Sequence, residues 1–259
     1  MRATYVQRTI LFAALLGMVF LLFGIGHASK RLRAKREIEL GQREYRNGNY
    51  SSATAHFERA LQLDPQSSVN LRLMLAVNKS GPSNATLAIQ EYENVLKLDP
   101  NRIEAIEGLA AVHLWNANYP EAKRYYVRAV QLNPMNPENF YGAGVVDWRR
   151  CYNERTSRRT ELNLKLGTPL IHSRACRSLR DQNMPVVEEG MTMFNKALQL
   201  RPDYADAMAY LNLMYRERAD IQCGNLAAYK HDLRQADDWV DRTMSAKKAA
   251  AERAANGIR

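Results

Sequence analysis

A nine-residue ending recurs four times along this chain of 259 residues. It reads FERALQLDP, YENVLKLDP, YVRAVQLNP and FNKALQLRP, and it closes at Pro65, Pro100, Pro134 and Pro202. Successive prolines are 35, 34 and 68 residues apart, and the last interval is twice 34. A period of this length is typical of stacked helical hairpins, in which each hairpin covers the apolar face of its neighbour. The spacing therefore predicts an all-α solenoid.

The first repeat shows how one hairpin is encoded. Its first helix is expected to end before Asn47-Gly48-Asn49, because glycine and asparagine tolerate the positive φ of a tight turn. Pro65 ends the repeat because proline lacks the N–H that would continue a helix. The second helix carries apolar residues at spacings of three and four, which form one stripe: Ala53, Phe57, Ala60, Leu61 and Leu63.

These positions resemble the tetratricopeptide repeat. The family has leucine and glycine in the first helix, alanine, an aromatic residue and alanine in the second, and a closing proline. The first repeat matches at Leu40, Gly41, Ala53, Phe57, Ala60 and Pro65. The third matches at Leu109, Ala110, Tyr119, Ala122, Tyr126, Ala129 and Pro134, and the second, more loosely, at Leu75, Ala76, Ala88, Tyr92 and Pro100. The resemblance implies a right-handed solenoid of helix-turn-helix repeats.

The repeats divide residues 30–245 into an expected series of hairpins, followed by a basic, alanine-rich tail at 246–259. We expect repeats at about 35–67, 68–102 and 103–136, a fourth at 137–203 split by a basic insertion at 158–182, and a degenerate capping hairpin at 204–245. The insertion contains Gly167-Thr168-Pro169 and no aromatic residue, which argues against another full repeat there. Alternatively, the first helix of the fourth repeat continues as far as Leu166.

Residues 1–29 are expected to form a hydrophobic anchor. Thr9 to Gly26 is a run of 18 residues without a charge, which as a helix spans roughly 27 Å, close to the thickness of a hydrocarbon core. A cleaved signal peptide is the alternative, supported by the small residues of Gly26-His27-Ala28. The length of the run and the KRLRAKR that follows favour an uncleaved transmembrane helix. The bases from Lys30 to Arg36 lean toward a cytoplasmic repeat domain, with a periplasmic or extracytoplasmic location as the alternative.

The formal net charge of +10 is concentrated outside the repeats. Residues 1–36 carry +7, residues 149–181 carry +6 and residues 247–259 carry +3, which leaves −6 for the rest of the chain. A mildly acidic repeat body is a poor groove for nucleic acid, so no nucleic-acid partner is expected. Anionic lipid or an acidic protein is instead expected to bind the basic insertion.

The sequence carries no motif of an enzyme. Its histidines are scattered, and P-loop, Gly-x-Ser-x-Gly and GxGxxG motifs are absent. The chain has no Cys-x-x-Cys pair among its three cysteines, Cys151, Cys176 and Cys223. We predict that they are free thiols, with one disulfide among them as the alternative. Cys176, between Arg174 and Arg177, is the one faintly activated group. We therefore expect no catalysis, no cofactor and no metal.

Function is expected to reside in a concave groove lined by the first helices, where repeats of this kind bind extended or helical peptides. The repeat register projects eleven residues onto that face: Ile38, Gln42, Tyr45, Leu73, Met74, Val77, Glu107, Trp115, Tyr141, Val145 and Trp148. For Tyr141 and Trp148 the alternative is packing on the insertion or on the last hairpin. Members of the family that bind chaperones use lysine, asparagine and arginine to hold a carboxylate, but the matching positions here are Ile38, Gln42, Met74, Glu104 and Gly108. A co-chaperone role is therefore disfavoured.

The leading hypothesis is a non-catalytic scaffold at a membrane, which binds a protein or peptide partner in this groove. The alternative is a structural or assembly protein that acts by self-association, with the groove filled by its own insertion.

Overall fold

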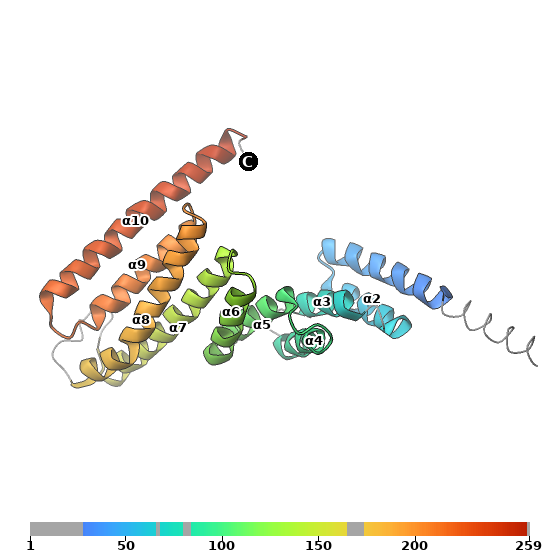
Figure 1. The fold of residues 1–259 in the computed structure, drawn as a ribbon, viewed down its shortest axis with the longest axis horizontal. Helices are drawn as coiled ribbons and strands as arrows, with labels where there is room; N and C mark the ends of the chain where they lie inside the picture. The colour runs from blue at the N-terminus through green and yellow to red at the C-terminus, as the bar shows by residue number, and fades with distance from the viewer. Residues whose placement is uncertain (1–27, 66–67, 80–83, 165–173, 258–259) are drawn as a thin grey trace, which may run out of the picture. The chain divides into compact units, whose positions relative to one another are not determined.

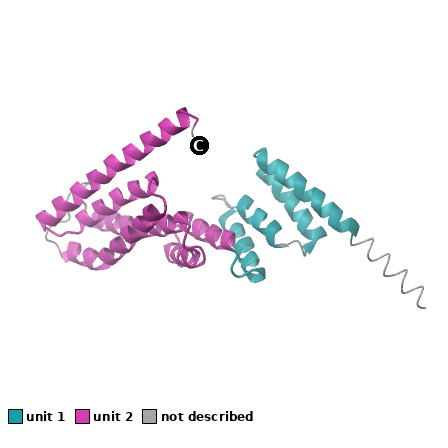
Figure 2. Ribbon diagram, turned by 45° about the horizontal axis from the view of Figure 1, so that its top comes forward, with its two compact units in different colours: residues 1–102 teal, residues 103–259 magenta. Residues whose placement is uncertain are grey.

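The computed structural model describes residues 28–65, 68–79, 84–164 and 174–257 (Figure 1). Within these ranges the regular structure is helical and no strand occurs. The predicted anchor at Thr9 to Gly26 lies outside the described residues. In the part of the chain that the structure does describe, no helix has the length and apolar character needed to cross a membrane. The chain divides into two compact units, residues 1–102 and 103–259 (Figure 2).

The described part of unit 1 starts with a helical stretch at 28–46, which is followed by α2 (Tyr50–Leu63), α3 (Ser68–Lys79) and α4 (Ala85–Leu98). Gly48 adopts a φ of +78° in the first turn, as the Asn-Gly-Asn sequence predicts. Gly41 faces the ring of Phe57, and a Cβ at Gly41 would lie 2.5 Å from that ring. The missing side chain therefore lets the ring of α2 pack against the backbone of the preceding helix. The buried cluster comprises Ala53, Phe57, Ala60, Leu71 and Leu75.

Unit 2 contains three helical hairpins in which each helix packs on the next. The hairpins are α5 (Ile103–Trp115) with α6 (Tyr119–Leu132), α7 (Pro137–Glu161) with α8 (Arg174–Leu200), and α9 (Ala205–Asp220) with α10 (Leu226–Ala255). The arrangement of Gly41 and Phe57 recurs here, because a Cβ at Gly144 of α7 would lie 2.7 Å from the ring of Phe194 of α8. Helices α7 to α10 lie side by side in Figure 1.

The predicted insertion at 158–182 lengthens the fourth hairpin. Helix α7 has 25 residues and α8 has 27, whereas α5 and α6 have 13 and 14. The alternative that α7 reaches Leu166 is wrong, because the helix ends at Glu161 and Asn163 takes a φ of +50°. Helix α8 starts at Arg174, and it buries Cys176 and Leu179 of the predicted insertion in the core of unit 2.

The extended part of the fourth hairpin is joined to α9 by ion pairs. Arg155 donates from Nε and Nη2 to the two carboxylate oxygens of Glu217, at 2.6 and 2.8 Å. One turn further along α7, Nη2 of Arg159 lies 3.1 Å from Oδ2 of Asp220. The positive charge of residues 149–181 is thus partly neutralised by acidic residues of α9 inside the fold.

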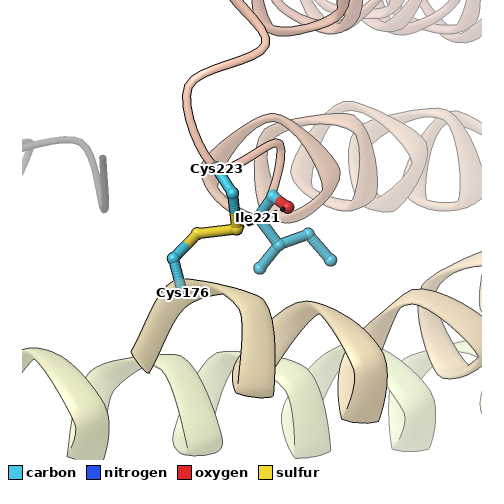
Figure 3. The surroundings of a disulfide bond; sticks show 3 residues. All are labelled: Cys176, Ile221 and Cys223. Atoms are coloured by element: carbon cyan, nitrogen blue, oxygen red, sulfur yellow. Dashed lines mark hydrogen bonds between the residues drawn. A yellow bond between two sulfur atoms is a disulfide. The ribbon is translucent and has the colours of Figure 1, made fainter. Parts of the chain in front are cut away.

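The structure corrects the prediction of three free thiols. Cys176, in the first turn of α8, forms a disulfide with Cys223, in the turn between α9 and α10 (Figure 3). The alternative of one disulfide among the three cysteines is the one that the structure shows, and Cys176 is therefore not an activated free thiol. Cys151 is free and fully buried, and burial raises the pKa of its thiol to about 12. Sequence spacing missed the pair because its members are 47 residues apart, on elements that the repeat pattern does not align.

Candidate peptide-binding surfaces

Unit 2 carries an open hollow of about 690 Å³ on the side of its first helices, which we call the unit 2 hollow. Its walls come mainly from α5 and α7, with two residues from α6 and one from α9. The lining residues are Glu107, Leu114, Trp115, Ala117, Tyr119, Tyr126, Asn136, Glu138, Asn139, Tyr141, Gly142, Val145, Arg149 and Tyr210. The mixture of aromatic, amide and carboxylate groups suits a peptide, which offers both apolar side chains and backbone hydrogen bonds.

The start of α7 is positioned by a cap that also holds α5. Asn136 precedes the helix, and its Oδ1 accepts a hydrogen bond of 3.1 Å from the backbone N–H of Glu138. Pro137 occupies the first helical turn, where its missing N–H needs no partner. Nδ2 of Asn136 donates to Oε1 of Glu107 on α5, at 3.0 Å. One asparagine therefore fixes the spacing of two walls of the hollow.

Gly142 lets a second-helix residue reach the hollow. The ring of Tyr126, from α6, packs directly on the backbone of α7 in the space that a Cβ at Gly142 would fill. Burial, together with the nearby carboxylates of Glu107 and Glu138, raises the pKa of Tyr126 to about 12. The phenol consequently stays protonated at neutral pH and can donate a hydrogen bond.

Another wall of the unit 2 hollow belongs to an aromatic cluster that joins α7 to α8 and α9. The ring centroid of Tyr141 lies 5.0 Å from Tyr204, 5.5 Å from Tyr210 and 6.1 Å from Phe194. Burial raises the pKa of Tyr141 as well, so this phenol is also neutral. Glu138 accepts the O–H of Tyr204 and lies 2.8 Å from Nη1 of Arg201. The aromatic wall is therefore held by packing and hydrogen bonds rather than being free to collapse.

Trp115 forms the exposed rim of the unit 2 hollow. Its side chain, at the end of α5, is 83% exposed, although indole is among the most costly side chains to leave in water. The turn that follows contains Ala117 at a φ of +56°, and it leads directly into α6. Exposed tryptophans of this kind are enriched among the residues that dominate binding energy at protein interfaces.

Unit 1 carries a smaller and more apolar hollow of about 460 Å³, which we call the unit 1 hollow. It lies between the helical stretch 28–46 and α3, with the ring of Phe57 at its base. Nε2 of Gln42 contacts the sulfur of Met74 at 3.9 Å. The lining residues are Gln42, Tyr45, Arg46, Phe57, Leu73, Met74 and Val77.

Nine of the eleven residues projected from the sequence line one of these two hollows, each within its own unit. The unit 1 hollow is lined by Gln42, Tyr45, Leu73, Met74 and Val77. The unit 2 hollow is lined by Glu107, Trp115, Tyr141 and Val145. Ile38 packs on the buried cluster of unit 1. Trp148 packs against Tyr152 and Tyr210, with centroid distances of 5.2 Å to each, so it lies on the last hairpin.

Sequence reasoning missed several lining residues for two reasons. Tyr126 belongs to a second helix, which the repeat register directs away from the groove, and it reaches the hollow only because Gly142 has no side chain. Tyr210 belongs to the degenerate last hairpin, where no register was available. Asn136 could have been found, because Asn-Pro before a helical pattern is a recognised start signal.

No described residue of the insertion lines either hollow. The hollows are thus not filled by residues 158–164 or 174–182. Among the residues that the structure describes, no group of three or more histidine, cysteine or acidic side chains is placed to hold a metal ion.

The comparisons with known proteins agree with this architecture. Residues 36–67 match the family model described as tetratricopeptide repeat. A solved structure of MamA superimposes with a TM-score of 0.59 at 15% identity, over 85% of this chain and 94% of that one. The chain has a tetratricopeptide-type repeat fold.

Two further proteins are similar to this chain. MamA from Desulfovibrio magneticus RS-1, from residue 41 to its end, superimposes with a TM-score of 0.60 at 18% identity, over 84% of this chain and 96% of that one. The photosystem I assembly protein Ycf3 of Prochlorococcus marinus (strain MIT 9211) is 24% identical over 138 residues, which is 52% of this chain and 68% of that protein. The expectation of an all-helical repeat fold is confirmed.

Proposed function

We propose that this protein is a non-catalytic scaffold of the tetratricopeptide type, and that it binds a protein or peptide partner in the unit 2 hollow. The observation that carries the proposal is Trp115, which is 83% exposed at the rim of a hollow whose other walls are held in place. A partner that covers this indole removes a large apolar surface from water, and it meets the neutral phenol of Tyr126, which can donate a hydrogen bond.

A role in assembly is the most direct form of this proposal. Ycf3 of Prochlorococcus marinus is named as an assembly protein of photosystem I, and it shares about half of this chain at 24% identity. We carry over the type of role, the holding of protein components during assembly, and not the photosystem itself. The uncharged run at Thr9 to Gly26 supports a membrane as the place of this role.

Site-specific photo-crosslinking in cells tests the proposal. A photoactivatable aromatic amino acid, which keeps a large apolar ring at this position, replaces Trp115 in the full chain, and a matched variant carries it at Met135, which is 73% exposed but lines neither hollow. We expect discrete crosslinked species from position 115 that position 135 does not give. Identical products at both positions, or none at position 115, would contradict the proposal.

A second arm connects the crosslink to the rim. The photoactivatable residue is moved to Arg149, which lines the same hollow, and Trp115→Ala is added. Loss of a buried interface tryptophan usually costs at least about 2 kcal/mol, so the crosslinked fraction should fall roughly tenfold or more below saturation. Met135→Ala is the matched control and should leave the fraction unchanged. A product with twice the mass of the chain would indicate the alternative, self-association.

A further inference from the structure

The disulfide joins two parts of unit 2 that the repeat pattern does not relate. Cys176 lies in the first turn of α8, within the lengthened part of the fourth hairpin, and Cys223 lies in the turn between α9 and α10 (Figure 3). Their Cα atoms are 5.6 Å apart, which falls in the range of natural disulfides. The bond closes a span of 47 residues and thereby fastens the lengthened hairpin to the last one.

Contacts other than the disulfide position the turn that carries Cys223. Nε2 of Gln222 donates to Oδ2 of Asp232 at 2.6 Å, and Asp232, on α10, is 2% exposed. Arg218 donates from Nε and Nη2 to the other oxygen of Asp232, at 3.0 and 2.6 Å. Ile221, beside the disulfide in Figure 3, is 1% exposed. The fold therefore presents Cys223 to Cys176 through buried polar and apolar contacts.

The third cysteine is kept out of this chemistry. Cys151 is fully buried, and its sulfur lies 3.9 Å from the carbonyl oxygen of Asn183. Disulfide exchange requires a thiolate, and burial opposes the formation of one at Cys151. Cys176 is equally buried, but the fold sets it against the half-buried Cys223 with Cα atoms 5.6 Å apart, so proximity directs pairing to these two cysteines although the chain has three.

We propose that Cys176 and Cys223 are a physiological oxidation site, the substrate of a disulfide-bearing oxidant, and that unit 2 resides in an oxidising compartment outside the cytoplasm. Disulfides persist in such compartments, whereas the cytosol keeps thiols reduced. This assignment favours the extracytoplasmic location over the cytoplasmic one that the basic residues of KRLRAKR favour. It does not depend on either hollow, and so it goes beyond the proposed function.

The reaction balances with one molecule of a protein or small-molecule disulfide. Cys223 is only half-buried, so its thiolate attacks a sulfur of the oxidant, and one oxidant thiol leaves. The thiolate of Cys176 then attacks the sulfur of Cys223 and releases the second oxidant thiol. The two cysteines together lose two electrons and two protons, and the oxidant leaves as two thiols. Cys176 is fully buried, which makes Cys223 the point of entry.

Counting thiols in acid-quenched cells tests the oxidation site. Acid traps the redox state before lysis, and the denatured full chain is then alkylated with a maleimide that adds a visible mass per thiol. We expect one alkylated thiol in the wild type without reduction and three after reduction. Cys176→Ser should show two without reduction, whereas the matched control Cys151→Ser should show none. Three thiols in the unreduced wild type would overturn the proposal, and this readout does not require the variants to fold.

The location is tested separately with protease on intact spheroplasts. We expect unit 2 of the full chain to be digested without lysis of the membrane, while a cytoplasmic marker protein is spared. Protection of unit 2 until the membrane is opened would overturn the extracytoplasmic assignment. In cells that lack their thiol oxidant, the unreduced wild type should gain two alkylated thiols, and an unchanged count would contradict the assigned oxidant chemistry.

Discussion

Replacement of Gly144 by alanine should destabilise the protein, although alanine is the better helix former. In an exposed helix the change from glycine to alanine gains about 1 kcal/mol. At Gly144, however, the new Cβ would lie 2.7, 2.8 and 3.0 Å from three atoms of the Phe194 ring, all closer than an ordinary contact. Overpacking of this kind costs about 1–3 kcal/mol, and three simultaneous contacts place the cost near the upper end. We expect a net loss of about 2 kcal/mol.

A double-mutant cycle isolates the contact between Gly144 and Phe194. Phe194→Leu removes the ring atoms that the new Cβ would meet, and the cost of the smaller side chain in the core cancels in the cycle. In the Phe194→Leu background, Gly144→Ala should therefore be neutral or stabilising by up to about 1 kcal/mol. The measurement is urea unfolding of the purified full chain, followed by far-ultraviolet circular dichroism for the four members of the cycle. Gly41→Ala, opposite Phe57, should repeat the result in unit 1.

Two outcomes would refute this reasoning. The first is a stabilising Gly144→Ala in the wild-type background, which would mean that helix propensity outweighs the ring contact. The second is the same change in free energy of unfolding in both backgrounds, because contacting residues must show a coupling energy.

Two further predictions concern unit 2. Cys176→Ser with Cys223→Ser should lower the free energy of unfolding by roughly 4 kcal/mol in urea, as expected from chain entropy for a closed span of 47 residues; an equal midpoint to that of the oxidised wild type would contradict this. Asp147 is buried, and burial raises the pKa of its carboxyl group from 3.8 to about 6. Nζ of Lys123, 2.5 Å from Oδ2 of Asp147, lowers this pKa but does not offset the effect of burial. Ionisation of Asp147 therefore opposes folding: the wild type should lose stability relative to Asp147→Asn as pH rises from 4 to 7, by an amount on the order of 3 kcal/mol. Parallel stability curves of the two proteins over that range would refute it.

The repeat spacing was sufficient to predict the fold because the same physical solution appears twice. Gly41 opposite Phe57 and Gly144 opposite Phe194 are both pairs of a bare backbone and a buried ring. Each ring lies eight residues before its closing proline, Pro65 or Pro202, although the insertion sets Gly144 farther from its proline than Gly41 is. A pattern of this kind depends on local spacing, which a single sequence contains. The boundaries of α7 and α8 depend on packing against α9, which the spacing does not encode.

The candidate site was predictable only where it follows the register of the first helices. Trp115 and Tyr141 were placed from that register, and both line the unit 2 hollow. Trp148 is one turn beyond the lining residue Val145, but its ring packs against Tyr210. Tyr210 belongs to the last hairpin, whose sequence does not follow the repeat pattern. Which aromatic residue faces a partner and which faces a neighbour is decided by tertiary contacts between residues distant in sequence.

The bonds between the last two hairpins change how this part of the chain should melt. In an ideal solenoid each hairpin touches only its neighbours, so unfolding can begin at an end and progress one repeat at a time. Here Arg155 of α7 forms an ion pair with Glu217 of α9, and the disulfide joins α8 to the turn before α10. Fraying of the terminal hairpin would have to break both links at once. The C-terminal end of a repeat array is normally the first part to unfold. Here the helices α7 to α10 should instead unfold together in one cooperative step.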